Sequence, residues 1–186
     1  MPRLSDVLDT TDFSLAELCA ARIDGELVPV LDHWVAVDAP DVPAVRARAL
    51  GGGPDGPAIA GWSAAWVHGA TPIPPAIAEF CVPHGARVAR SRDPRRLVRE
   101  VTIAAADLTI AGGCRCTSLE RTAFDLLRDP ELDVERLAPV LAELIGRDAA
   151  LPARLRARFA PERRVPHRRL ALVRLNELGR LTGLRS

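Results

Sequence analysis

The chain has 186 residues, of which 48% are hydrophobic and 26% charged, a size and composition that suit one medium domain or two small ones sharing a core. No apolar run approaches the roughly 18 residues of a membrane span, which excludes a helical membrane protein. We see no secretory signal and no disulfide pattern in its four cysteines, so we expect a cytoplasmic protein.

All 25 basic residues are arginines, and the chain contains no lysine. Because arginine stays protonated, it cannot act as a general base. This composition argues against the lysine-assisted carboxylate chemistry of restriction-type nucleases.

Charge is distributed unevenly along the chain. Residues 1–55 hold 4 arginines and 10 acids, residues 56–146 hold 10 and 11, and residues 147–186 hold 11 and 3. The net charges are therefore −6, −1 and +8. The basic C-terminal segment favours an anionic partner, either nucleic acid or an acidic protein, whereas the acidic N-terminal segment would repel phosphates.

The first 50 residues predict a helix and a hairpin. Ser14 and Glu17 form a capping box that begins a helix extending to about residue 22. Extended segments are predicted at 26–31 and 33–37, and a short helix at 44–50. A helix followed by a hairpin is the second half of a winged helix. The predicted buried stripe of the first helix is Leu15, Leu18 and Cys19.

Glycine and proline interrupt the chain over residues 51–57. The triple glycine lacks the lysine and Ser/Thr of a phosphate-binding loop, and the prolines remove amide donors. We interpret the run as a domain boundary. The predicted domains are a degenerate winged-helix-like segment over 1–50, an α/β core over 51–130 and a basic helical part over 131–186.

A helix of about two turns is predicted at residues 60–69, whose sequence is Ala-Gly-Trp-Ser-Ala-Ala-Trp-Val-His-Gly. Ser63 is expected to cap this helix and Gly69 to end it. The two tryptophans share one face, as in a core helix. His68 is interpreted as a packed or capping residue.

The remaining chain predicts four strands and then helices, which gives an α+β fold with a small mixed sheet, a packed core helix and a helical C-terminal part. Thr117 and Glu120 are expected to form a capping box, and Pro139 to kink or split its helix. The predicted strands are 77–82, 97–103, 108–110 and 114–117, and the predicted helices 117–128, 134–145, 151–159 and 167–181.

Two segments carry a recognisable pattern. Residues 60–69 match small-Gly-x-Ser/Thr-Ala-Ala-x-x-His-Gly, and residues 112–127 are similar to Gly-(x)-x-x-Val-Thr-x-x-Glu-Arg-Thr-x-x-Asp-Leu. Both patterns resemble those of the AbiEi family of antitoxins, over roughly residues 14–130. The motif residues are Gly61, Ser63, Trp66, His68, Gly69, Arg121 and Asp125.

The resemblance implies an antitoxin of a type IV toxin–antitoxin system. Such a protein represses its own operon through an N-terminal winged helix and counteracts a nucleotidyltransferase toxin through its C-terminal part. We therefore expect a non-enzymatic regulator without cofactors. Its expected partners are the cognate toxin and promoter DNA, and no membrane.

A metal-dependent nuclease or nucleotide-processing enzyme is the alternative. Cys81, His84, Cys114 and Cys116 offer four potential zinc ligands, although the last two are separated by one residue and structural zinc sites usually have two to four. The spacing of Arg121 and Asp125 indicates an ion pair within a helix. We assign no catalytic residue and no metal ligand.

Arginines that suit bidentate contact with phosphates or carboxylates gather in a loop after residue 86 and in the C-terminal helices. In the latter, a stripe of Leu151, Leu155 and Phe159 predicts that the arginines project outward. The predicted nucleic-acid or partner-binding residues are Arg87, Arg90, Arg92, Arg95, Arg96, Arg99, Arg154, Arg158, Arg163, Arg164, Arg168 and Arg169.

Overall fold

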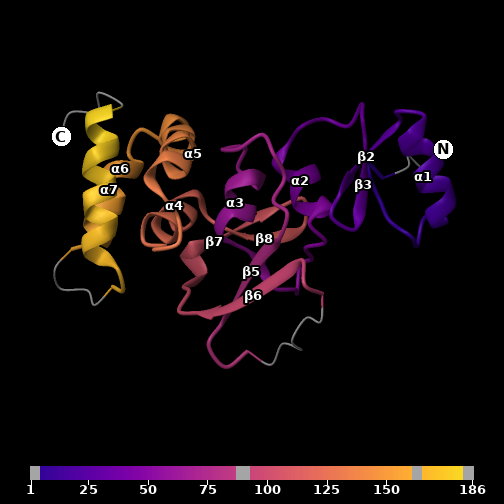
Figure 1. Ribbon diagram of the computed structural model, residues 1–186. Coiled ribbons are helices and arrows are strands. Elements are labelled where there is room, and N and C mark those ends of the chain that lie inside the picture. Colours follow the sequence, from indigo (N-terminus) through magenta and orange to yellow (C-terminus); the bar gives the residue numbers. More distant parts are fainter. Residues whose placement is uncertain (1–4, 87–92, 161–164, 182–186) are drawn as a thin grey trace.

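The computed structural model describes residues 5–86, 93–160 and 165–181, with seven α-helices and two small β-sheets among them. The fold is α+β, as predicted. Figure 1 shows an elongated arrangement in which the N-terminal sheet lies at one end, the C-terminal helices at the other, and the larger sheet between them.

The N-terminal unit is a three-stranded antiparallel sheet, ordered β1-β3-β2, with one helix. The helix begins with the predicted Ser14–Glu17 capping box, and Gly25 at φ 79° follows its end. Strand β1 was not predicted, because two residues are too few to show a period. The elements are β1 (Val7–Leu8), α1 (Leu15–Ile23), β2 (Leu27–Val30) and β3 (His33–Ala36).

The buried stripe predicted for α1 is wrong in part. Leu18 is buried against Leu8 and Leu27, but Leu15 is 57% exposed and Cys19 is exposed as well. Successive residues turn by about 100° around a helix, so Cys19 points away from the narrow contact that Leu18 makes.

Helix α2 (Pro43–Ala49) joins the N-terminal unit to the larger sheet. Val30 and Val45 belong to one apolar cluster with Trp66, Phe80 and Cys114, which lie beyond the glycine-rich segment. The parts of the chain before and after residues 51–57 therefore share one hydrophobic core.

The larger sheet is mixed, with the order β6-β5-β4-β8-β7. Strand β4 pairs antiparallel with β5 and parallel with β8, β5 pairs parallel with β6, and β7 pairs antiparallel with β8. Four strands agree with the prediction, whereas two-residue β4 was missed. The elements are β4 (Ala58–Ile59), β5 (Ala78–Pro83), β6 (Arg96–Val101), the 3-10 helix η1 (Ala105–Asp107), β7 (Leu108–Ala111) and β8 (Cys114–Thr117).

Five helices complete the fold, and α3 and α4 pack against each other between the sheet and the C-terminal helices (Figure 1). Pro139 lies inside α5, which is a single helix and is not split. No helix in the described part of the chain has the length and apolarity to cross a membrane. The helices are α3 (Gly61–Val67), α4 (Leu119–Leu127), α5 (Val134–Arg147), α6 (Leu151–Arg158) and α7 (Arg168–Leu181).

Two predicted helix caps are wrong. The N-cap of α4 is Ser118, whose side chain accepts from the Arg121 amide, while Thr117 shares a 2.7 Å hydrogen bond between hydroxyls with Thr122. Helix α3 begins after Ala60 without a side-chain cap. The Ser63 hydroxyl instead accepts from the Glu79 amide on β5 at 2.8 Å, so it ties the helix to the sheet.

Candidate functional site

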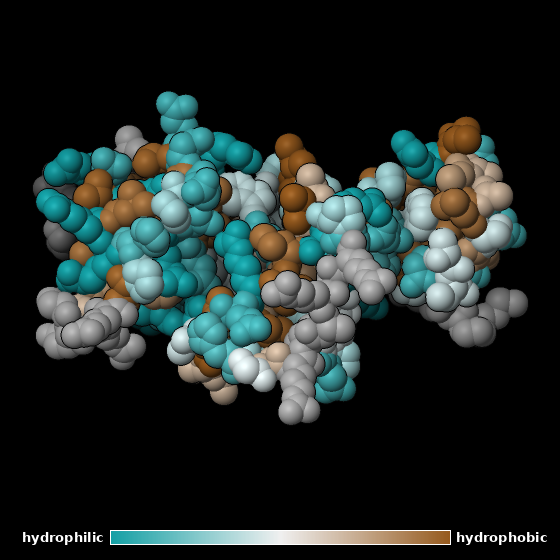
Figure 2. Space-filling model, turned by 60° about the horizontal axis from the view of Figure 1, so that its bottom comes forward, coloured by the Kyte–Doolittle hydropathy of each residue, from teal (hydrophilic) through white to brown (hydrophobic). Residues whose placement is uncertain are grey.

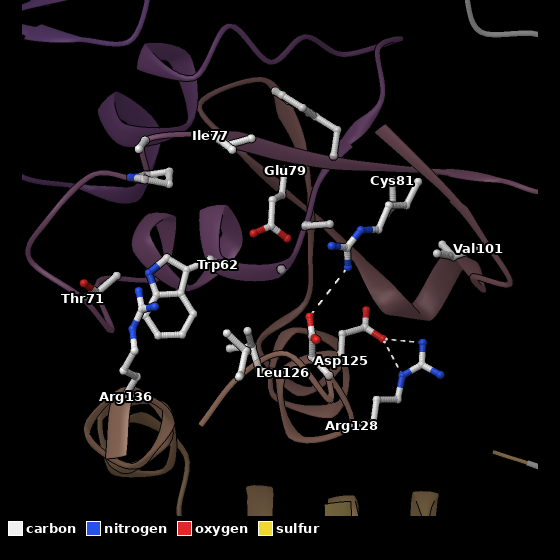
Figure 3. Close-up of a pocket in the computed structure, with 18 of the residues that line it drawn as sticks. Trp62, Thr71, Ile77, Glu79, Cys81, Val101, Asp125, Leu126, Arg128 and Arg136 are labelled. Atoms are coloured by element: carbon white, nitrogen blue, oxygen red, sulfur yellow. Dashed lines mark hydrogen bonds and ion pairs between the residues drawn. The ribbon is translucent and has the colours of Figure 1, made fainter. Parts of the chain in front are cut away.

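A cleft of about 720 Å³ lies beside the motif helix α3. Strands β5 and β6, the start of α3 and the proline-rich segment 71–77 form part of its wall, and the end of α4 and the turn after it form the rest. Figure 3 shows charged and apolar side chains pointing into the same space.

Glu79 is the carboxyl that β5 directs into this cleft (Figure 3). Burial raises its pKa and the nearby Asp129 raises it further, while Arg99 and the Trp62 amide act in the opposite direction. The close approach requires glycine at position 61, because Gly61 has φ 54° and any Cβ there would collide with the Glu79 carboxylate.

The arginines that line the cleft already have partners within the chain. Arg99 lies 3.7 Å from Asp129, and Arg128 lies 3.1 Å from Asp125. The guanidinium of Arg136 lies over the Trp62 ring, 5.7 Å from its centroid. Glu79 forms no ion pair with any of these three arginines within the described residues.

The motif residues of α3 hold neighbouring backbone in place. His68 Nε2 lies 2.8 Å from the Thr117 carbonyl oxygen, so it carries the proton and donates. The carbonyls of Trp66 and Gly69 accept from arginines outside the helix, Arg46 at 2.6 Å and Arg147 at 3.1 Å. These bonds connect α3 to α2, β8 and α5.

Arg121 of the second motif is the centre of a buried ion network. It is 3% exposed and lies 2.8 Å from Asp107 and 2.7 Å from Asp125. The prediction of a pair with Asp125 is confirmed, but Asp107 had not been identified. Arg158 lies 2.7 Å from Asp107 on the other side. Burial alone would raise the pKa of Asp107, but these arginines and the Ala104 amide lower it.

Three of the arginines predicted to bind nucleic acid or a partner after residue 86 contact other residues of this chain. Arg95 pairs with Asp32 of the β2–β3 turn, and Arg99 pairs with Asp129. Arg96 lies over the Phe80 ring, 4.5 Å from its centroid. Arg95 and Arg99 keep about half of their side chains exposed. Arg87, Arg90 and Arg92 lie outside the described residues.

The expectation that the arginines of α6 project outward as unpaired charges is wrong for Arg154 and Arg158. Arg154 pairs with Glu120 and Asp148, and Arg158 pairs with Asp107 and Glu120. Arg168 donates to the Phe159 carbonyl at 2.6 Å. Arg154 and Arg158 connect α6 to neighbouring elements instead, because acidic groups of α4 and η1 lie beside α6. Arg169 is exposed, and Arg163 and Arg164 lie outside the described residues.

The cysteines do not form the zinc site considered above. Cys81, Cys114 and Cys116 are buried free thiols, and burial raises the pKa of Cys81 to about 11 and that of Cys116 to about 12. Thiolates are the form that binds zinc. Among residues 5–86, 93–160 and 165–181, no three His, Cys, Asp or Glu side chains gather as metal ligands.

The sequence did not indicate the roles of three charged residues: Glu79 at the cleft, Asp107 beside Arg121, and Arg174 of α7, which is 4% exposed and donates to a carbonyl at the end of α4. Asp107 and Glu79 show no local motif, and Arg174 falls within a helix of many arginines. For Glu79, the sequence offers one sign of a functional role, which is a single acid inside an otherwise apolar strand. Comparison of the chain with protein-family models and with curated proteins gave no match.

The burial of His68 predicts a pH dependence of stability. Burial lowers the pKa of His68 below its ordinary 6.5, and nearby Arg147 lowers it further, whereas the bond to Thr117 raises it. Between the lowered and the ordinary pKa, the unfolded chain binds the extra proton. We expect the free energy of unfolding to fall as pH drops below about 6.5.

Urea unfolding at pH 7.5, 6.0 and 5.0 measures this effect. His68→Gln removes the titrating group, so its unfolding free energy should change less across this range than that of the unsubstituted protein. Equal pH slopes for the two proteins would show that His68 does not contribute.

Proposed function

We propose that this protein is an antitoxin-like regulator of the AbiEi type, which binds and counteracts a nucleotidyltransferase toxin without catalysing a reaction itself. The observation that carries the proposal is that the two motif segments lie together. Helices α3 and α4 pack against each other, and His68 of the first segment donates to Thr117 of the second at 2.8 Å.

The contacts of the motif side chains support a structural role for these residues. Ser63 binds the β5 backbone, His68 binds β8, and Arg121 is enclosed by two carboxylates. Each polar group is thereby committed to holding two elements together. A family pattern made of such residues identifies an architecture, and the activity then belongs to the surfaces that this architecture presents.

The N-terminal unit fits a truncated winged helix in which β2 and β3 form the wing and α1 the one remaining helix. A complete winged helix would place a recognition helix in the DNA groove. We propose that repression of the promoter, where it occurs, uses the arginines near the start of β6, because the N-terminal unit is acidic.

We place toxin binding on the basic C-terminal part. Arg156 and Arg169 are exposed on α6 and α7, respectively. Their planar guanidinium groups suit bidentate contact with carboxylates on an acidic toxin face.

Co-expression with a nucleotidyltransferase toxin of the type IV class, encoded next to this gene, tests this proposal, and the absence of such a gene would count against it. The protein should restore growth of cells that express the toxin. A double variant, Arg156→Glu with Arg169→Glu, should fold normally but lose the rescue, since exposed substitutions cost about 0.5 kcal/mol or less. Arg22→Glu, on exposed α1, is the matched control and should rescue fully.

Failure of the unsubstituted protein to rescue, with both proteins present in the soluble fraction, would refute the antitoxin function. Rescue by the double variant would retain the function but move the toxin contact elsewhere. Stoichiometric zinc in the purified protein, lost in Cys114→Ser, would favour the enzyme alternative.

A further inference from the structure

Helix α1 exposes a continuous apolar face. Five residues on the side away from Leu18 share it, at positions that fall together on a helix of 3.6 residues per turn. The α1 face consists of Leu15, Ala16, Cys19, Ala20 and Ile23, all of them exposed.

The exposed residues of this face adjoin one another along the helix. Leu15 is 57% exposed and Ile23 is 84% exposed, and no charged side chain interrupts the face between them. Figure 2 shows hydrophobic side chains at the surface of the end of the molecule that carries α1. Contiguous exposed apolar surface of this kind marks an interaction site.

The N-terminal unit does not use this face for its own stability. Its apolar cluster is built on the buried residues Leu8, Leu18 and Leu27, on the opposite side of α1. Substitutions on the α1 face should therefore leave the unit folded, which makes the face accessible to experiment.

Carboxylates predominate around the α1 face, with Glu17 and Asp24 along one edge and Arg22 along the other. Residues 5–38 contain 8 acids and 1 arginine, which is Arg22. Asp12, Glu17 and Asp24 lie on α1 or next to its ends, and all three are exposed. A partner that covers the face must tolerate or neutralise this negative rim.

We propose that the α1 face is a docking site for a basic amphipathic helix of another protein. Apolar side chains of that helix would pack on Leu15 and Ile23, and Ala16 and Ala20 would let the two helix backbones approach closely. Its arginines or lysines would meet Asp12, Glu17 and Asp24. Recognition of an apolar helix face with charged edges is a common mode of peptide binding.

Charge argues against two other occupants, the α1 face of a second copy and DNA. Pairing of two α1 faces would bring two acidic rims together, and a two-fold antiparallel pairing would place the Glu17 side chains of both copies on the same flank. DNA would meet the same negative rim. The proposal goes beyond the antitoxin function and does not depend on it.

The rate at which Cys19 is alkylated reports whether the α1 face is covered. Cys19 is the exposed cysteine, while the other three are buried, so a thiol-alkylating reagent should modify it first. The probe is a synthetic amidated peptide of about 18 residues, long enough to form a helix, with a leucine stripe and lysines elsewhere. It should bind the full chain and slow alkylation of Cys19 several-fold, and higher salt should weaken the binding.

Ile23→Asp should weaken peptide binding by about tenfold or more, a change of about 1.4 kcal/mol, because a carboxylate would be buried in the contact. Ile110→Asp on β7 is the matched control, because Ile110 is a 64% exposed isoleucine on a different surface, and it should not change binding. Circular dichroism and urea unfolding of both variants confirm that they fold.

Three results would overturn the proposal. Equal binding of a scrambled peptide with the same composition would show attraction by charge alone. A dimer of the unsubstituted protein that Ile23→Asp dissociates would make a second copy the occupant. Promoter DNA that protects Cys19 from alkylation, while the peptide does not, would make α1 a nucleic-acid contact.

Discussion

Replacement of Arg121 by methionine should lower the free energy of unfolding by about 3–5 kcal/mol, as expected when one partner of a buried ion pair is removed. Arg121 is 3% exposed, and its guanidinium also donates to the Thr102 carbonyl at 2.8 Å. The loss should lie toward the lower end of this range, because Arg158 still neutralises Asp107 and Arg128 still neutralises Asp125.

Urea unfolding of Arg121→Met and of the matched control Arg156→Met measures this effect. Arg156 is exposed on α6, so its replacement should change the free energy of unfolding by about 0.5 kcal/mol or less. The Arg121 effect should persist at high salt, since buried pairs are little screened. A loss below about 1 kcal/mol for Arg121→Met would show that apolar packing around Phe124 replaces the network.

Local patterns predicted most of the secondary structure. The capping box of α1, the β2–β3 hairpin and the terminal helices depend on neighbours within a few residues, so the sequence contains the relevant interactions. Strands β1 and β4 have two residues each and exist because a neighbouring strand pairs with them. Such strands are determined by tertiary contacts and leave no periodic pattern.

The site was harder to predict, because its electrostatics depend on residues far apart in the chain. Arg158 was expected to be a binding residue, yet it pairs with Asp107, 51 residues earlier, and with Glu120, 38 residues earlier. A count of charges along the sequence cannot show such neutralisation. The same limit applies to Glu79, whose raised pKa results from burial at the cleft.

Arg174 couples the last helix to the centre of the molecule. It is 4% exposed, and it donates to the carbonyls of Leu127 at 3.0 Å, Asp129 at 2.7 Å and Leu132. These carbonyls belong to the end of α4 and the turn after it, where a helix has unsatisfied acceptors and a negative dipole end. A single cation on α7 thus satisfies the C-terminal end of α4.

We expect Arg174→Met to lower the free energy of unfolding by about 3 kcal/mol, because buried carbonyls lose a charged donor. Arg180→Met on the same helix is the control and should change it by about 0.5 kcal/mol or less, since Arg180 is exposed. Hydrogen exchange should show faster opening at the end of α4 and in α7, with β7 and β8 unchanged.

An unchanged free energy of unfolding in Arg174→Met would contradict this expectation. Burying a cation carries a desolvation cost that methionine avoids. Such a result would mean that this cost cancels the three hydrogen bonds, and that apolar residues such as Leu175 and Leu178 hold α7 in place.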